Sequence, residues 1–244
     1  LEAWACTRRR VFGAVGVQDL SGGEARGWVL QGGETWLRVT LDEVVDHARR
    51  VCRGVRRALV VADMPFGSFQ VGPEDAVRSA IKLIKDGGAH AVKLEGGVAV
   101  EDSIRRIVNA QIPVMGHVGL TPQSVNQMGG YRVQGRGDDG RHQVIEDALA
   151  VEAAGAFSCV LEGIPEDLGR EISERLTIPT IGIGAGVHCD AQVLVMHDLL
   201  GLNDWTPSFV KQYGNLGAQA SKAARSYVDE VVNRKFPDEE HSYR

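Results

Sequence analysis

The feature of this sequence that most restricts its fold is a short apolar run that ends on polar residues and recurs along the chain. Residues 89–97 (AHAVKLEGG) are the clearest case, because an apolar start is followed by Lys93, Glu95 and two glycines. Apolar runs of this length, punctuated by glycine, are typical of buried parallel strands. Charged side chains at the end of such a strand need polar partners, so we expect them at the rim of a sheet.

Three further segments follow the same plan: residues 58–63, 112–117 and 157–162, which end on Asp63, His117 and Glu162. Predicted helices separate the strands, and the alternation repeats about eight times, which predicts a parallel sheet covered by helices. Eight repeats favour a closed (β/α)8 TIM barrel, formed as a single domain by residues 1–244, over an open doubly wound sheet.

Other patterns along the chain are weaker. Residues 1–5 and 17–23 are interpreted as the first two strands, and residues 192–196 as the eighth. The glycine-rich stretch 119–141 is predicted to be a long functional loop. A helix is expected over residues 144–154, where apolar positions recur at helical spacing.

Composition narrows the class of partner. The formal net charge of −5 over 244 residues offers no electrostatic attraction for nucleic acid or an anionic membrane. The sequence has no apolar run of about 18 residues and no pattern of a signal peptide, so we expect a cytoplasmic protein that acts on small molecules. The four cysteines lack CxxC spacing and are interpreted as reduced thiols: Cys6, Cys52, Cys159 and Cys189.

In a closed barrel, the carboxyl ends of all strands meet at one mouth. That geometry would gather Asp63, Lys93, Glu95, His117 and Glu162 from different strands. Three converging carboxylates repel one another unless a cation neutralises them, and carboxylate oxygens suit a hard ion such as Mg²⁺. Plainer interpretations stay open, since a single carboxylate can cap a helix or pair with a surface arginine, and a single histidine can serve as a hydrogen-bonding support.

Five longer motifs are distinctive: residues 61–68 (VADMPFGS), 92–97 (VKLEGG), 116–124 (GHVGLTPQS), 129–136 (GGYRVQGR) and 182–186 (GIGAG). Together they resemble the ketopantoate hydroxymethyltransferase family, and the resemblance extends from about Val39 to the C-terminus. It implies a (β/α)8 barrel of the phosphoenolpyruvate/pyruvate superfamily, dependence on Mg²⁺, and usually a homodecamer of two pentameric rings.

The resemblance also implies a reaction. The family transfers a hydroxymethyl group from 5,10-methylenetetrahydrofolate to 3-methyl-2-oxobutanoate through a Mg²⁺-stabilised enolate, giving 2-dehydropantoate for pantothenate biosynthesis. Carried over by position, Asp63 and Glu95 bind the metal, and Asp63, Lys93 and His117 contact the 2-oxo acid. Glu162 is the catalytic base, and Lys93 assists catalysis through its positive charge.

The N-terminal part departs from the family pattern. Family members carry Val-Gly-Asp-Ser after the second strand, and ungapped alignment places Glu24 and Ala25 at the metal-binding Asp and substrate-binding Ser. Glu24 remains a candidate metal and substrate ligand with a longer side chain, whereas Ala25 offers no hydroxyl. Two alternatives therefore stay open: an aldol-type enzyme acting on a different 2-oxo acid, and a non-catalytic barrel homologue.

Overall fold

The computed structural model describes residues 19–22, 36–203 and 205–243, and the chain divides into two compact units, residues 1–195 and 196–244. The first unit contains the sheet and the predicted site. The second contains α9 (Met196–Leu200) and α10 (Leu216–Val232). No helix in the described ranges is long and apolar enough to cross a membrane.

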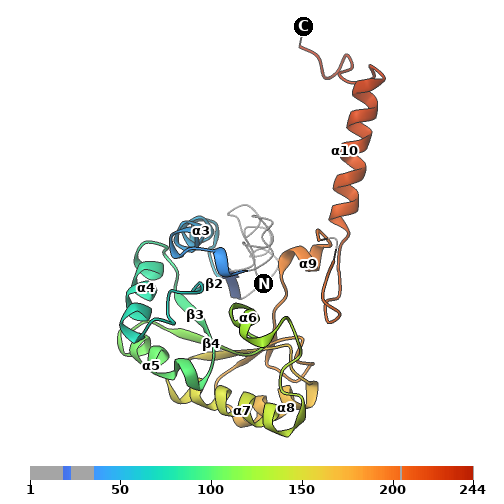
Figure 1. Ribbon diagram of the computed structural model, residues 1–244. Helices are drawn as coiled ribbons and strands as arrows, with labels where there is room; N and C mark the ends of the chain where they lie inside the picture. The colour runs from blue at the N-terminus through green and yellow to red at the C-terminus, as the bar shows by residue number, and fades with distance from the viewer. Residues whose placement is uncertain (1–18, 23–35, 204, 244) are drawn as a thin grey trace. The chain divides into compact units, whose positions relative to one another are not determined.

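The first unit is built on seven parallel strands whose order in the sheet follows their order in the sequence (Figure 1). They are β1 (Asp19–Gly22), β2 (Leu59–Asp63), β3 (Ala91–Glu95), β4 (Val114–Gly119), β5 (Ser158–Glu162), β6 (Thr180–Ile183) and β7 (Ala191–Gln192). The predicted parallel α/β sheet is confirmed, including the weak strand expected over residues 17–23. The described residues contain these seven strands, and the closed eight-stranded ring stays a prediction.

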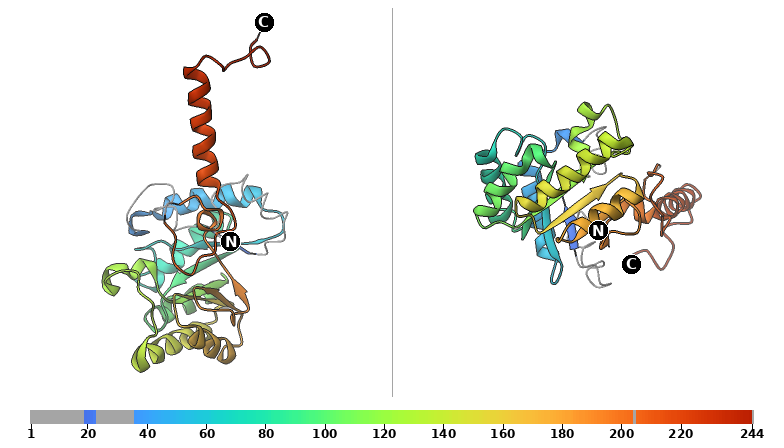
Figure 2. Two further views of the ribbon diagram at one scale, coloured as in Figure 1. Left: turned by 90° about the vertical axis from the view of Figure 1, so that its right-hand side faces the viewer. Right: turned by 90° about the horizontal axis from the view of Figure 1, so that it is seen from below.

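Helices cover one face of the curled sheet (Figures 1 and 2). They are α3 (Leu41–Gly54), α4 (Pro73–Lys85), α5 (Glu101–Asn109), α7 (Gly137–Ala153) and α8 (Glu166–Arg175). The start of α3 is set by a capping box, in which the Thr40 hydroxyl accepts from the Glu43 N–H and the Glu43 carboxylate accepts from the Thr40 N–H. Each helix connects two neighbouring parallel strands, as a right-handed crossover requires.

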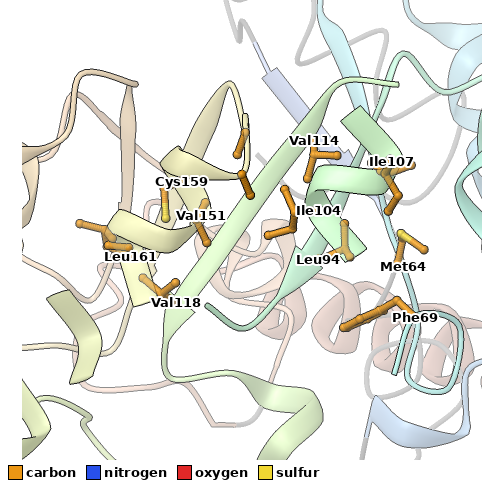
Figure 3. Packing of buried hydrophobic residues seen from close by; sticks show 14 of the residues in the cluster. Met64, Phe69, Leu94, Ile104, Ile107, Val114, Val118, Val151, Cys159 and Leu161 are labelled. Carbon is orange, nitrogen blue, oxygen red and sulfur yellow. The ribbon is translucent and has the colours of Figure 1, made fainter. Parts of the chain in front are cut away.

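Alternate residues of each strand face different surroundings. On the helix-covered face, Leu94 and Val114 pack against Ile104 and Ile107 of α5 (Figure 3). The opposite, inner face has its own small core of strand residues, which contains Val61, Ala91, Met115 and Val160. Burying a side chain such as Leu94 stabilises the fold by about 1.5–3 kcal/mol. The period of two therefore decides which side of the sheet each polar residue must occupy.

Two predicted elements differ from the structure. The expected strand 192–196 is wrong: β7 ends at Gln192 and Met196 begins α9. A short apolar run such as VLVM fits a strand and a buried helix equally well, so periodicity could not decide. The stretch 119–141 is not one long loop, because it contains η3 (Pro122–Ser124), α6 (Val125–Met128) and the beginning of α7.

Gly116 allows α7 to lie close to β4. A Cβ atom at this position would lie 2.2 Å from Cγ1 of Val151, so Gly116→Ala forces the helix and strand apart. We expect a loss of about 1–3 kcal/mol in the free energy of unfolding, measured by urea denaturation. Gly140→Ala, at a position inside α7, is the matched control: its Cβ would make an ordinary contact, 3.5 Å from Cα of Gly135. Alanine there should raise stability by ~0.5–1 kcal/mol, and equal losses in both variants would contradict this account of Gly116.

Candidate functional site

Five polar residues lie at or near the carboxyl ends of β2 to β5 with the parity of the inner face. Asp63 is two residues beyond Val61, and Lys93 and Glu95 follow Ala91 at the same spacing. His117 is two residues beyond Met115, and Glu162 is two beyond Val160. Their side chains therefore leave the sheet on the face opposite the helices. The strand register sets Asp63 beside Lys93 and Glu95 beside His117.

Lys93 joins two of these strands through its ammonium group. Its Nζ lies 2.7 Å from Oδ1 of Asp63, and the two side chains are only 11% and 3% exposed. Nζ also lies 3.2 Å from Nδ1 of His117. A charged ammonium can only donate hydrogen bonds, so Nδ1 of His117 must be the acceptor. In the neutral ring the proton is consequently on Nε2 of His117.

His117 links Lys93 to the remaining carboxylates. Its Nε2 lies 3.0 Å from Oε2 of Glu162, and its Nδ1 lies 3.7 Å from Oε1 of Glu95. The Nε2 contact is within ion-pair distance, but the N–H is not aligned with the Glu162 oxygen. His117 and Glu95 are buried, whereas the Glu162 side chain keeps 16% exposure. Glu162 is thus the carboxylate of this set most open to an incoming molecule.

The Glu95 carboxylate is held by a residue that sequence reasoning missed. The main-chain N–H of Gln123 donates to Oε2 of Glu95 at 2.9 Å, and Gln123 is itself buried. Its side-chain amide donates to the Met64 carbonyl oxygen at 2.8 Å, directly after Asp63. Gln123 stands in the motif 116–124, but the motif alone does not show that a residue of the β4 loop connects β2 and β3.

The loop 182–186, which resembles a phosphate loop only weakly, is anchored at its base by Asp190. This carboxylate accepts hydrogen bonds from the N–H and hydroxyl of Thr180, which hold the pKa of Asp190 below its usual range. Burial raises the thiol pKa values of Cys159 and Cys189, and neither thiol forms a disulfide. The Cys52 thiol donates to the Gly88 carbonyl oxygen at 3.0 Å. These thiols agree with the predicted reduced state, and Cys6 lies outside the described residues.

The predicted metal ligands fit a hard cation in their chemistry. Asp63 and Glu95 offer carboxylate oxygens from the inner-face ends of adjacent strands, and Mg²⁺ is often held by one or two carboxylates with water and substrate. Within the described residues, no group of three His, Cys, Asp or Glu side chains could hold a metal ion. Glu24 and Ala25, the other predicted metal and substrate residues, lie outside those residues.

Comparison with solved structures identifies the fold. The crystal structure of 2,3-dimethylmalate lyase, a PEP mutase/isocitrate lyase superfamily member, matches with a TM-score of 0.59 and 18% identity. The match covers 99% of this chain and 85% of that protein, so the two chains share the same α/β fold.

Comparison with sequences identifies the family. The model of the ketopantoate hydroxymethyltransferase family matches residues 1–239. The 3-methyl-2-oxobutanoate hydroxymethyltransferase of Geobacter metallireducens is 53% identical, with 96% of this chain and 88% of the relative covered. That of Clostridium beijerinckii is 50% identical, with 100% and 89% covered. The chain belongs to the ketopantoate hydroxymethyltransferase family and is a transferase, which confirms the resemblance seen in its motifs.

Proposed function

We propose that this chain transfers a hydroxymethyl group from 5,10-methylenetetrahydrofolate to 3-methyl-2-oxobutanoate, giving 2-dehydropantoate for pantothenate biosynthesis. The observation that carries the proposal is the set of inner-face side chains at the strand ends: Asp63, Lys93, Glu95, His117 and Glu162. Abstraction of a proton beside a carbonyl group needs a base and positive charge near the developing oxyanion, and this set contains both.

In this proposal, Asp63, Glu95 and Glu24 hold Mg²⁺. When bound, the ion supplies a Lewis acid for the keto oxygen of the 2-oxo acid. The oxygen donors of Asp63 and Glu95 support the assignment, because hard cations prefer carboxylates. Glu24 contributes a third carboxylate, one methylene longer than the aspartate of the family pattern.

The remaining residues remove a proton from the substrate and stabilise the negative charge that develops on it. Glu162 removes the proton from C3, since it is the most exposed carboxylate of the set. His117 places Nε2 3.0 Å from the Glu162 carboxylate, while Lys93 places positive charge beside the substrate oxygen. The resulting carbanion equivalent forms the new carbon–carbon bond from its C3 to the one-carbon unit, whose two bonds to the folate nitrogens break. Water supplies the hydroxyl oxygen and one proton, the proton from C3 supplies the other, and the folate leaves as tetrahydrofolate.

The same proposal includes the assembly of the protein. In this proposal residues 1–244 form one (β/α)8 barrel domain, and the strand predicted over residues 1–5 lies outside the described residues. The family resemblance supports a homodecamer, and the protein acts in the cytoplasm. Crystallography can test the closed barrel, and analytical ultracentrifugation can test the decamer.

The test is an assay with Mg²⁺, 3-methyl-2-oxobutanoate and 5,10-methylenetetrahydrofolate. We expect 2-dehydropantoate, and in deuterated water without folate we expect exchange of the C3 proton, followed by NMR. Exchange with a different 2-oxo acid and no folate-dependent product would favour the aldol-type alternative. An inactive, folded wild type that gains activity as the Glu24→Asp, Ala25→Ser variant would favour the non-catalytic homologue.

A further inference from the structure

We propose that Gln123 is a positioning residue, which fixes the carboxylates of Asp63 and Glu95 relative to each other so that they can receive a divalent cation together. This inference rests on the metal site of the proposed function. Gln123 is 5% exposed and lies in η3, on the loop that follows β4. Gln123 therefore lies in a different loop from the loops that follow Asp63 and Glu95.

The first contact of Gln123 sets the orientation of Glu95. Its main-chain N–H donates to Oε2 of Glu95 at 2.9 Å in a buried environment. A hydrogen bond between an N–H and a carboxylate is charge-assisted and stronger than one between neutral groups. The bond leaves Oε1 as the Glu95 oxygen nearer to His117, at 3.7 Å from Nδ1.

The second contact holds the end of β2. The Gln123 side-chain amide donates to the Met64 carbonyl oxygen at 2.8 Å, while the Met64 N–H donates to the Lys93 carbonyl oxygen at 2.9 Å. The main chain of Met64 is thus bonded twice, through its N–H to β3 and through its C=O to Gln123. A single buried glutamine consequently ties the carboxylate of β3 to the backbone that carries the carboxylate of β2.

A third contact fixes the orientation of the Gln123 amide. Nε2 of Gln70 donates to Oε1 of Gln123 at 3.0 Å, and Oε1 of Gln70 accepts from the Gly67 N–H at 2.7 Å. The donors and acceptors of both amides are consistent only with Nε2 of Gln123 facing Met64. Gln70, which is exposed, therefore supports Gln123 from the loop between β2 and α4.

The experiment measures Mn²⁺ binding to the full chain without substrate, by the electron paramagnetic resonance signal of free Mn²⁺. Gln123→Ala keeps the main-chain N–H to Glu95 but removes the amide that holds the Met64 carbonyl oxygen. Groups that orient metal ligands typically contribute 10–100-fold to metal affinity, so this loss should weaken Mn²⁺ binding by about tenfold or more. Gln70→Ala removes only the support of that amide and should shift affinity in the same direction by a smaller factor. It also keeps the test decisive if Gln123→Ala does not fold.

Gln134→Ala is the matched control. The Gln134 side-chain amide likewise donates to a loop carbonyl oxygen, that of Arg132 at 2.8 Å, but it does not contact Glu95 or Met64. We expect its Mn²⁺ affinity to equal that of the wild type. Unchanged affinity in both Gln123→Ala and Gln70→Ala would overturn the inference, as would an equal loss in Gln134→Ala.

The inference and the proposed function can fail separately. A wild type that forms 2-dehydropantoate, with variants that bind Mn²⁺ normally, would remove the role of Gln123 and leave the function standing. A wild type that forms no product, with weakened Mn²⁺ binding in the variants, would remove the function and support the role of Gln123. A wild type that does not bind Mn²⁺ would contradict both.

Discussion

Glu162→Gln is expected to lower the rate of C3 proton exchange and kcat by about 10³-fold, because a positioned general base typically contributes 10²–10⁴-fold. The amide keeps the size of the side chain and still offers an oxygen to Nε2 of His117, which lies 3.0 Å from Oε2 of Glu162. It cannot take up a proton. Exchange is followed by NMR in deuterated water, and turnover by formation of 2-dehydropantoate.

Glu166→Gln serves as the control for this loss. Glu166 opens α8 after the same strand and pairs with His188 at 3.3 Å, outside the set of inner-face residues. The control should keep wild-type rates. Exchange that continues at the wild-type rate in Glu162→Gln would show that another group removes the proton.

Lys93→Met should give the largest loss of stability. Asp63 would lose its ion-pair partner at a site where its side chain is 3% exposed. Breaking a buried pair by removing one member costs about 3–5 kcal/mol, because the remaining charge stays desolvated. Urea denaturation without divalent cations measures this loss in the free energy of unfolding.

Two comparisons sharpen the Lys93 prediction. Lys82→Met breaks the pair with Asp42, whose side chains are 39% and 80% exposed, and should change stability by about 1 kcal/mol or less. Adding Mg²⁺ should recover part of the loss in Lys93→Met, since an ion bound only to the folded state stabilises it. If Lys93→Met were as stable as Lys82→Met without metal, the claim that the buried Lys93–Asp63 pair stabilises the fold would be refuted.

The polar residues at the strand ends could be predicted from the apolar runs and from the two-residue alternation of side chains along a strand. Apolar runs indicate the strands, and Lys93 and Glu95 share a face because they are two residues apart on one strand. The meeting of strand ends at the mouth of a barrel predicts that Asp63, His117 and Glu162 lie near them. In the structure these five residues lie at or near the carboxyl ends of β2 to β5, which follow one another in the sheet as they do in the sequence.

The features that sequence reasoning missed depend on contacts between distant loops or on ambiguous patterns. Gln123 reaches Met64 and Gln70 across more than fifty positions, and hydrogen bonds of this kind leave no trace in hydrophobic periodicity. The early start of α7 was obscured by Gly137 and Gly140, although Asp138 and Asp139 in its first turn favour a helix N-terminus. The strand predicted over residues 192–196 was wrong because a short apolar run fits a strand and a buried helix equally well.

The most direct test of the account is a crystal structure of the protein soaked with Mn²⁺ and 3-methyl-2-oxobutanoate, with the metal located by anomalous scattering. We expect the anomalous peak between the carboxylates of Asp63 and Glu95, with the substrate's keto oxygen on the ion and its C3 facing Glu162. A metal bound elsewhere, or a substrate whose C3 faces away from Glu162, would contradict the proposed site and its chemistry.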